Sequence, residues 1–126
     1  MQRHFSRIMR TLSVGRMKGS SCSLWQPPVD MYQSETELIV CVEVAGIAPP
    51  GIKVMAESQA LTISGERKCA ITGINHVHRL EIEYGRFACR LPLPVVINVE
   101  NTSSEINNGF LLIRMPIIRP QGAVAL

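Results

Sequence analysis

The side chains that could do chemistry lie in the middle of the chain. They are two cysteines, two histidines and two glutamates: Cys69, Cys89, His76, His78, Glu81 and Glu83. A thiol beside an imidazole is the pair that nucleophilic catalysis needs. Thiol and imidazole groups together also bind metal ions, and paired carboxylates serve general acid–base catalysis. Whether any such chemistry occurs depends on whether these groups are placed to react.

No sequence context around these groups indicates an assembled site. Neither cysteine lies in a nucleophile elbow or a glycine-rich loop, and no CxxC pair or phosphate-binding glycine motif occurs. The two histidines have the i, i+2 spacing of a solvated strand face, and the two glutamates beside Arg79 favour surface ion pairs. We expect no catalytic residue, no bound metal and no cofactor. An activity that depends on Cys69, His76 and His78 is kept as an alternative.

The four cysteines are about twenty residues apart, which is not the spacing of a zinc or redox motif. Cys41 and Cys89 fall within apolar, strand-like runs, so we expect both to be small buried residues. Cys69 falls in a predicted loop and is expected to be exposed. This usage favours a reducing compartment, and we expect the cytoplasm.

The elements that must position these residues are predicted to be β-strands. Apolar and polar residues alternate in short runs at residues 37–44, 52–56, 61–64, 77–83, 86–91 and 110–115. Asn108-Gly109 is a strong hairpin signal, whereas residues 97–107 are polar and irregular. The last run is apolar on both faces, which suits a strand covered on both sides. About seven short strands predict an all-β, immunoglobulin-like antiparallel β-sandwich.

The charge of the chain divides at Asp30. The sequence has 126 residues and a net charge of +3. Residues 1–29 hold five of the 13 basic residues and no acid, so the remainder has eight basic and ten acidic residues and a charge of −2. A nucleic-acid-binding domain would carry its basic residues on the domain itself. The apolar runs are also too short to span a membrane. We predict an arm (1–28), one domain (29–116) and a tail (117–126).

The arm has the pattern of a basic amphipathic helix. Its apolar residues Phe5, Ile8, Met9 and Leu12 recur at helical spacing, and Arg3, Arg7 and Arg10 lie on the opposite face. Three interpretations fit this pattern: an arm that packs on a partner subunit, a targeting peptide, and a membrane-surface helix.

A series of short blocks lies between residues 25 and 115. In order, they are residues 25–32 (WQPPVDMY), 45–47 (AGI), 52–54 (IKV), 61–67 (LTISGER), 84–87 (YGRF), 93–94 (LP) and 108–111 (NGFL). In these blocks and their order, the chain resembles the alpha-crystallin domain of the small heat-shock proteins. The resemblance implies an ATP-independent holdase, a homo-oligomer built from dimers that binds partly unfolded client proteins and prevents their aggregation. It implies neither an enzyme nor a cofactor.

The resemblance also implies interaction sites, which we carry over residue by residue. Dimers would form through the loop around residues 67–77, with Ile71, Ile74 and Val77; the plain alternative is a surface loop. Larger assembly would use a C-terminal anchor, Val124 and Leu126, laid into a groove of a neighbour. The expected groove residues are Ile52, Val54, Cys89 and Leu91. Client contact is expected from the apolar residues of the arm, Phe5, Ile8, Met9 and Leu12.

One alternative function comes from a different class. A β-sandwich with these features could be a non-chaperone or co-chaperone interaction module that docks on one folded partner. Such a module would be a monomer with one saturable binding site.

Overall fold

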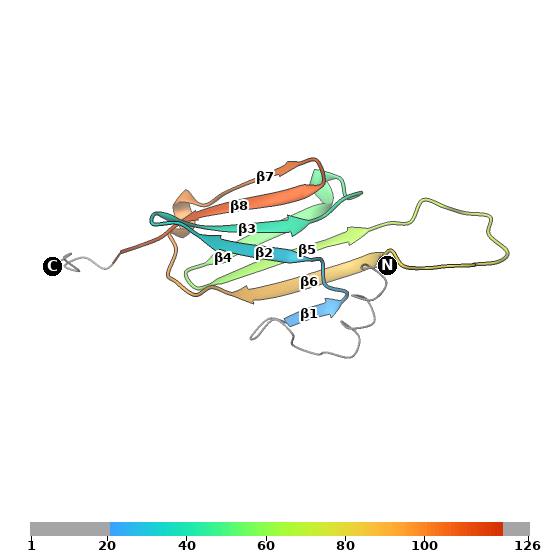
Figure 1. The fold of residues 1–126 in the computed structure, drawn as a ribbon, viewed down its shortest axis with the longest axis horizontal. Helices are drawn as coiled ribbons and strands as arrows, with labels where there is room; N and C mark the ends of the chain where they lie inside the picture. The colour runs from blue at the N-terminus through green and yellow to red at the C-terminus, as the bar shows by residue number, and fades with distance from the viewer. Residues whose placement is uncertain (1–20, 120–126) are drawn as a thin grey trace.

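In this computed structural model, residues 21–119 are described, and they form two four-stranded antiparallel sheets that share one hydrophobic core (Figure 1). The strands are β1 (Ser21–Leu24), β2 (Val29–Gln33), β3 (Glu37–Glu43), β4 (Ile52–Glu57), β5 (Ala60–Arg67), β6 (Gly85–Pro92), β7 (Ser103–Asn107) and β8 (Phe110–Pro116). The two short 3-10 helices are η1 (Pro49–Gly51) and η2 (Val99–Asn101). One sheet has the order β1-β6-β5-β4 and the other β2-β3-β8-β7. The predicted all-β antiparallel sandwich is confirmed.

The core follows from the alternation of apolar residues along the strands. Every second residue of β3 and β8 points inward, and each sheet contributes side chains with almost no exposure. The main contributors are Leu38, Val40, Val42, Leu61, Ile63, Phe87, Leu91, Leu111, Ile113 and Met115. Burying one such side chain stabilises the fold by about 1.5–3 kcal/mol. The core alone is thus large enough to hold the two sheets together.

The structure differs from the predicted strands in three places. Residues 77–83 alternate as a strand would, yet they belong to a loop, because no strand of the described chain pairs with them. β7 lies in the segment that looked polar and irregular, and pairing with β8 holds it in place as an edge strand. β1 lies in the predicted arm, where it pairs with β6. Edge strands are short and carry little apolar signal, so a sequence pattern alone underestimates them.

One turn and one strand position show why glycine is needed at particular places. Asn108 and Gly109 both have positive φ, as a two-residue hairpin turn between β7 and β8 requires. Gly65 lies where a Cβ atom would come within 2.8 Å of the Gly51 carbonyl oxygen and 3.1 Å of the Phe87 ring. The close approach of η1 to β5 therefore depends on a missing side chain at residue 65.

A buried arginine connects both sheets to the long loop that follows β5. Arg67 is 6% exposed. Its Nε donates to the Glu83 carbonyl oxygen at 2.9 Å and its guanidinium donates to the Ala45 carbonyl oxygen at 3.0 Å. The Glu43 carboxylate lies 3.5 Å from the same guanidinium. β5 is thereby linked to the end of β3 in the other sheet and to the end of the loop.

Aromatic rings complete the surroundings of this guanidinium. It lies 4.6 Å from the centre of the Trp25 ring and 5.9 Å from that of Tyr84. Trp25 packs edge-on against Phe87 and donates its indole N–H to the Gly85 carbonyl oxygen at 3.0 Å. A planar guanidinium can stack on rings and donate in its own plane at once. The two ends of the loop, residues 68–84, are therefore held at one point of the sandwich.

We predict that Arg67→Lys lowers the free energy of unfolding by roughly 2–3 kcal/mol, because an ammonium cannot reproduce the stacking and would leave a buried carbonyl oxygen without its donor. The matched control is Arg90→Lys. Arg90 forms an exposed ion pair with Glu57, so the control should change stability by less than about 0.5 kcal/mol. Urea unfolding at one fixed protein concentration measures both. Equal effects of the two substitutions would contradict the role given to Arg67.

Candidate interaction surfaces

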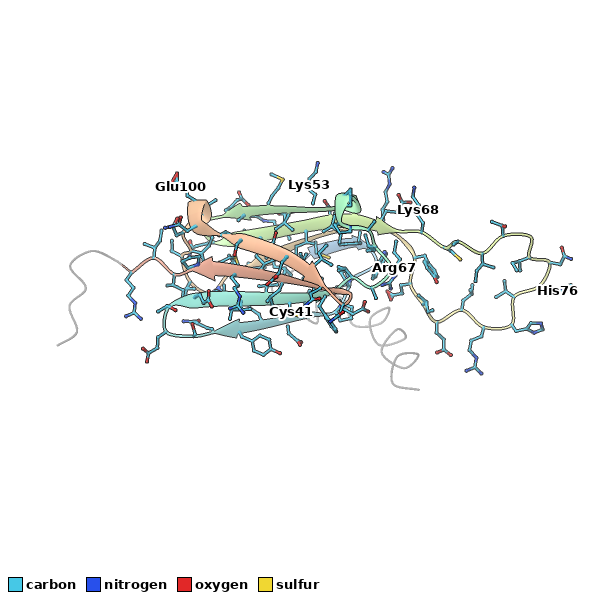
Figure 2. The ribbon with its side chains drawn as sticks, turned by 90° about the horizontal axis from the view of Figure 1, so that it is seen from above. Cys41, Lys53, Arg67, Lys68, His76 and Glu100 are labelled. Atoms are coloured by element: carbon cyan, nitrogen blue, oxygen red, sulfur yellow. The ribbon has the colours of Figure 1, made fainter. Side chains whose placement is uncertain are left out.

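The long loop, residues 68–84, is the most exposed apolar segment of residues 21–119. It extends away from the end of the sandwich, with His76 near its tip and Lys68 at its base (Figures 1 and 2). Among the described residues, twelve large apolar side chains are exposed, and half of them lie on this loop: Ile71, Ile74, Val77, Leu80, Ile82 and Tyr84. Water-exposed apolar residues gathered in this way mark an interaction site more often than a neutral surface.

The residues predicted for the dimer loop are all in this segment. Ile71, Ile74 and Val77 are 69%, 56% and 60% exposed. Leu80, Ile82 and Tyr84, which were not predicted to belong to the dimer loop, extend the same apolar series toward Gly85. Their i, i+2 spacing could have revealed them, because it places all three on one side of an extended chain.

The residues considered for chemistry also lie in or beside this loop. Cys69 is an exposed free thiol, and His76 and His78 are exposed. Arg79 pairs with Glu81 at 3.3 Å, as a surface ion pair would. Within residues 21–119 no three histidine, cysteine or acidic side chains come together as metal ligands.

Hollows on the surface of residues 21–119 include the following two. The first, of about 440 Å³, is at the end where β8 leaves the fold and is lined by Val95, Val96, Ile117 and Ile118 among others. The second, of about 540 Å³, lies over β5 and β6 and includes Ser64, Lys68 and Arg86. Neither contains a cysteine or a histidine, so neither gathers the thiol and imidazole groups considered above.

The predicted groove residues are not brought together. Ile52 and Val54 are half-buried in β4, at the edge of one sheet. Cys89 and Leu91 are in β6, with β5 between the two strands, and they are 1% and 0% exposed. A docked segment cannot reach them, so the prediction that Cys89 and Leu91 line an open groove is wrong. The apolar residue that instead shares the margin of the core with β4 is Ile106 of β7.

Cys89 differs from the prediction in a second way. It is buried, as expected, but it is part of a disulfide bond. The residue opposite Cys89 in the β1–β6 register is Cys22. Cysteine spacing in the sequence does not reveal which strands are neighbours, and the bond was therefore not predicted. Cys41 and Cys69 are free, and Cys41 is half-buried rather than buried.

Two predicted sites lie outside the described residues. They are the apolar residues of the arm, Phe5, Ile8, Met9 and Leu12, and the C-terminal anchor, Val124 and Leu126. Among residues 21–119 there is no helix of the length and apolar character that crossing a membrane requires.

Comparison with known proteins gives the same result at the level of family, sequence and structure. The family described as Hsp20/alpha crystallin matches residues 30–123. A 23.2 kDa heat shock protein of rice (Oryza sativa subsp. japonica) is 30% identical over 120 residues, which cover 90% of this chain and 56% of that protein. Small heat shock protein C4 of Rickettsia felis is 29% identical over 71% of this chain and 56% of its own length. The chain thus spans a little over half the length of these relatives.

Two similar solved structures are matched over nearly their whole length. The crystal structure of hspA from Xanthomonas axonopodis has a TM-score of 0.68 and 31% identity, covering 75% of this chain and 96% of that one. A small heat-shock protein from Xylella fastidiosa, described as having a distinct high order structure, has a TM-score of 0.70 and 27% identity over 82% of this chain and 96% of that one. The matched proteins are described as heat shock proteins. This chain belongs to the Hsp20/alpha crystallin family of small heat shock proteins.

Proposed function

We propose that this protein is an ATP-independent holdase, a homo-oligomer built from dimers that binds partly unfolded proteins and keeps them from aggregating. The observation that carries the proposal is the family match over residues 30–123, on a sandwich with half of its exposed large apolar residues on one loop. The cytoplasm is the compartment we propose. The basic arm leaves organelle targeting open, and one relative is a chloroplast small heat shock protein of tomato.

A holdase needs adaptable apolar surface rather than a reactive centre. Partly unfolded clients expose apolar side chains and unpaired strands, and these can bind to apolar surface or to a free sheet edge without any covalent step. Met and Phe adapt to varied partners because they are large and apolar, and Met is also flexible. The client-contact residues we propose are therefore Phe5, Ile8, Met9 and Leu12 of the arm.

Dimer formation is proposed to use residues 68–84. The segment has no strand partner within its own chain, although residues 77–83 alternate as a strand does. An extended chain of this kind can add itself to the edge of a neighbouring sheet, gaining backbone hydrogen bonds there. Ile71, Ile74 and Val77 would then be buried against the partner. Because Arg67 holds both ends of the segment at one point, the segment begins from the same position in each subunit.

Assembly beyond the dimer is proposed to use the C-terminal anchor, Val124 and Leu126. In an extended chain these two side chains point to the same side. Ile52 and Val54 are half-buried along the open edge strand β4 and already contact the core, so they offer apolar surface to such a pair. Of the four predicted groove residues, we therefore propose only Ile52 and Val54 as contacts of the anchor. Cys89 and Leu91 are too deeply buried to contact it.

We predict that the purified chain suppresses light scattering of a heat-denatured client enzyme at a near-stoichiometric ratio, with no added nucleotide. The physical reason is that exposed apolar surface competes with client self-association. The same assay with ATP should give the same curve. Absence of protection over a range of ratios and temperatures would reject the holdase. A sharp 13.9 kDa monomer at all concentrations, measured by size-exclusion chromatography with light scattering, would favour the module that binds one folded partner.

For the dimer, we predict that replacing Ile71, Ile74 and Val77 together with Ser raises the dimer dissociation constant at least about tenfold, which corresponds to about 1.4 kcal/mol of lost association free energy. The matched control replaces three other exposed apolar residues, Met55, Val96 and Val99, with Ser and should leave the constant unchanged. Sedimentation equilibrium measures both, and circular dichroism checks that the sandwich is folded. A loop variant that dimerises like the control would contradict the assignment.

For larger assembly, we predict that Val124→Ala with Leu126→Ala reduces the oligomer to dimers, because the apolar contact of the anchor is lost. The control variant carries Ala123→Ser and Ala125→Ser, whose side chains point to the other side of an extended chain, and it should keep the native mass. Native mass spectrometry distinguishes the two species. An unchanged mass in the first variant would reject the anchor.

A further inference from the structure

The outer face of the β2-β3-β8-β7 sheet is more apolar than a solvated sheet face usually is. Outward-facing residues of an antiparallel sheet that meets water are normally polar. On this face Ile39 and Cys41 of β3 and Leu112 of β8 are only half-buried, while Tyr32 and Phe110 are 57% and 50% exposed. Figure 2 shows Cys41 on the side of the sandwich opposite Lys53 of the other sheet.

The strand register places acidic groups at the borders of this apolar surface. Cys41 pairs with Asp30 on one side and with Leu112 on the other, and Leu112 pairs in turn with Glu105. One row across the sheet therefore runs from an acid through two apolar residues to a second acid. In the neighbouring row, Ile39 lies between Tyr32 and Arg114.

The charge of this face is negative. Arg114, a cation on this face, donates a hydrogen bond to the Glu37 carboxylate at 2.7 Å, so its positive charge is already paired. Asp30 accepts a hydrogen bond from the Tyr32 hydroxyl at 3.1 Å. This bond, together with the charge of Asp30, raises the pKa of Tyr32 above its ordinary value, so the phenol stays neutral. Neither Asp30 nor Glu105 has an ion-pair partner among residues 21–119.

The outer face of the other sheet differs in the sign of its charge. The charged residues on the outer side of the β1-β6-β5-β4 sheet are Lys53, Glu57, Glu66, Arg86 and Arg90, with Lys68 just beyond β5. That face carries more positive than negative charge, and a basic segment would be repelled there. A positively charged, apolar segment would therefore choose the face around Cys41 and Leu112.

The chain itself contains such a segment outside the described residues. Residues 1–20 hold five basic residues and no acid, and residues 120–126 hold no basic or acidic side chain at all. We propose that residues 3–12 dock on the outer face of the β2-β3-β8-β7 sheet. Phe5, Ile8, Met9 and Leu12 would cover the apolar surface, and Arg3, Arg7 and Arg10, on the opposite face of the segment, would be attracted by the charges of Asp30 and Glu105 at longer range.

The connecting chain is long enough for this docking. Residues 13–20 extend to about 26 Å at most. The two sheets are about 10 Å apart and neighbouring strands about 4.8 Å apart. β1 and β2 are joined by residues 25–28 alone and lie at the same margin of the sandwich (Figure 1). The segment can therefore pass the edge strand β2 and reach the face of its own subunit.

The docking proposal rests on the charge and the apolar surface of this face, and not on client binding. It nevertheless has a consequence for client binding. The side chains it covers include the arm residues that we propose to contact clients. A docked arm would withhold them, and a higher salt concentration would release them because it screens exposed charges.

Two reaction rates, both measured on the full chain, test the docking. One reports on the sheet face and the other on the arm. The first is the rate at which uncharged N-ethylmaleimide modifies Cys41, followed by peptide mass spectrometry. Replacing Arg3, Arg7 and Arg10 with Gln should raise this rate about tenfold, equivalent to about 1.4 kcal/mol of docking free energy. Replacing Arg16 and Lys18 with Gln is the control and should leave it unchanged.

The second rate is tryptic cleavage after Arg7 and Arg10, with cleavage after Arg16 as internal reference. Asp30→Asn with Glu105→Gln should speed it by a similar factor. The control, Glu66→Gln with Glu100→Gln, removes the same charge elsewhere and should not. The arm variants leave the sandwich untouched, so a folding defect cannot produce the first result. If either rate fails to separate from its control, the proposed docking is wrong.

Discussion

The arrangement of this molecule depends on how one buried positive charge is satisfied. The Arg67 guanidinium is taken out of water, which is costly unless every side of it finds a partner. It finds backbone carbonyl oxygens of Ala45 and Glu83, the carboxylate of Glu43 and the face of Trp25. These partners come from both sheets and from the end of the long loop. Arg67 therefore fixes both the packing of the two sheets and the point from which the long loop, residues 68–84, leaves the sandwich.

This arrangement separates stability from association. The core residues are almost fully buried and need no partner subunit. The loop, the edge strand β4 and the face around Cys41 carry apolar residues that contribute little to that core. Because these surfaces are distinct from the core, substitutions on them can change assembly without unfolding the domain. The proposed holdase activity requires this separation, since its binding surfaces must stay available while the fold persists.

The sandwich, its core strands and the Asn108-Gly109 turn could be predicted, because alternation and turn chemistry are local properties of the sequence. Neighbour relations between strands are not local. For this reason the prediction that Cys89 and Leu91 line a groove was wrong, and the disulfide bond of Cys89 was not predicted. The alternation of residues 77–83 predicted a strand that has no partner within one subunit. The role of Arg67 could not be predicted, since its hydrogen-bond acceptors are backbone atoms from segments far away in the sequence.

The pairing of β1 with β6 has a consequence for competition between binding events. It fixes the chain at Ser21 rather than at the start of β2, so anything carried on residues 1–20 is joined to the sandwich by a shorter tether. A short tether gives such a segment a local concentration in roughly the millimolar range around its own subunit. A client or a neighbouring subunit competing for the same surface has to exceed that internal concentration. The short strand at the margin thus sets the threshold at which an outside partner displaces the chain's own arm.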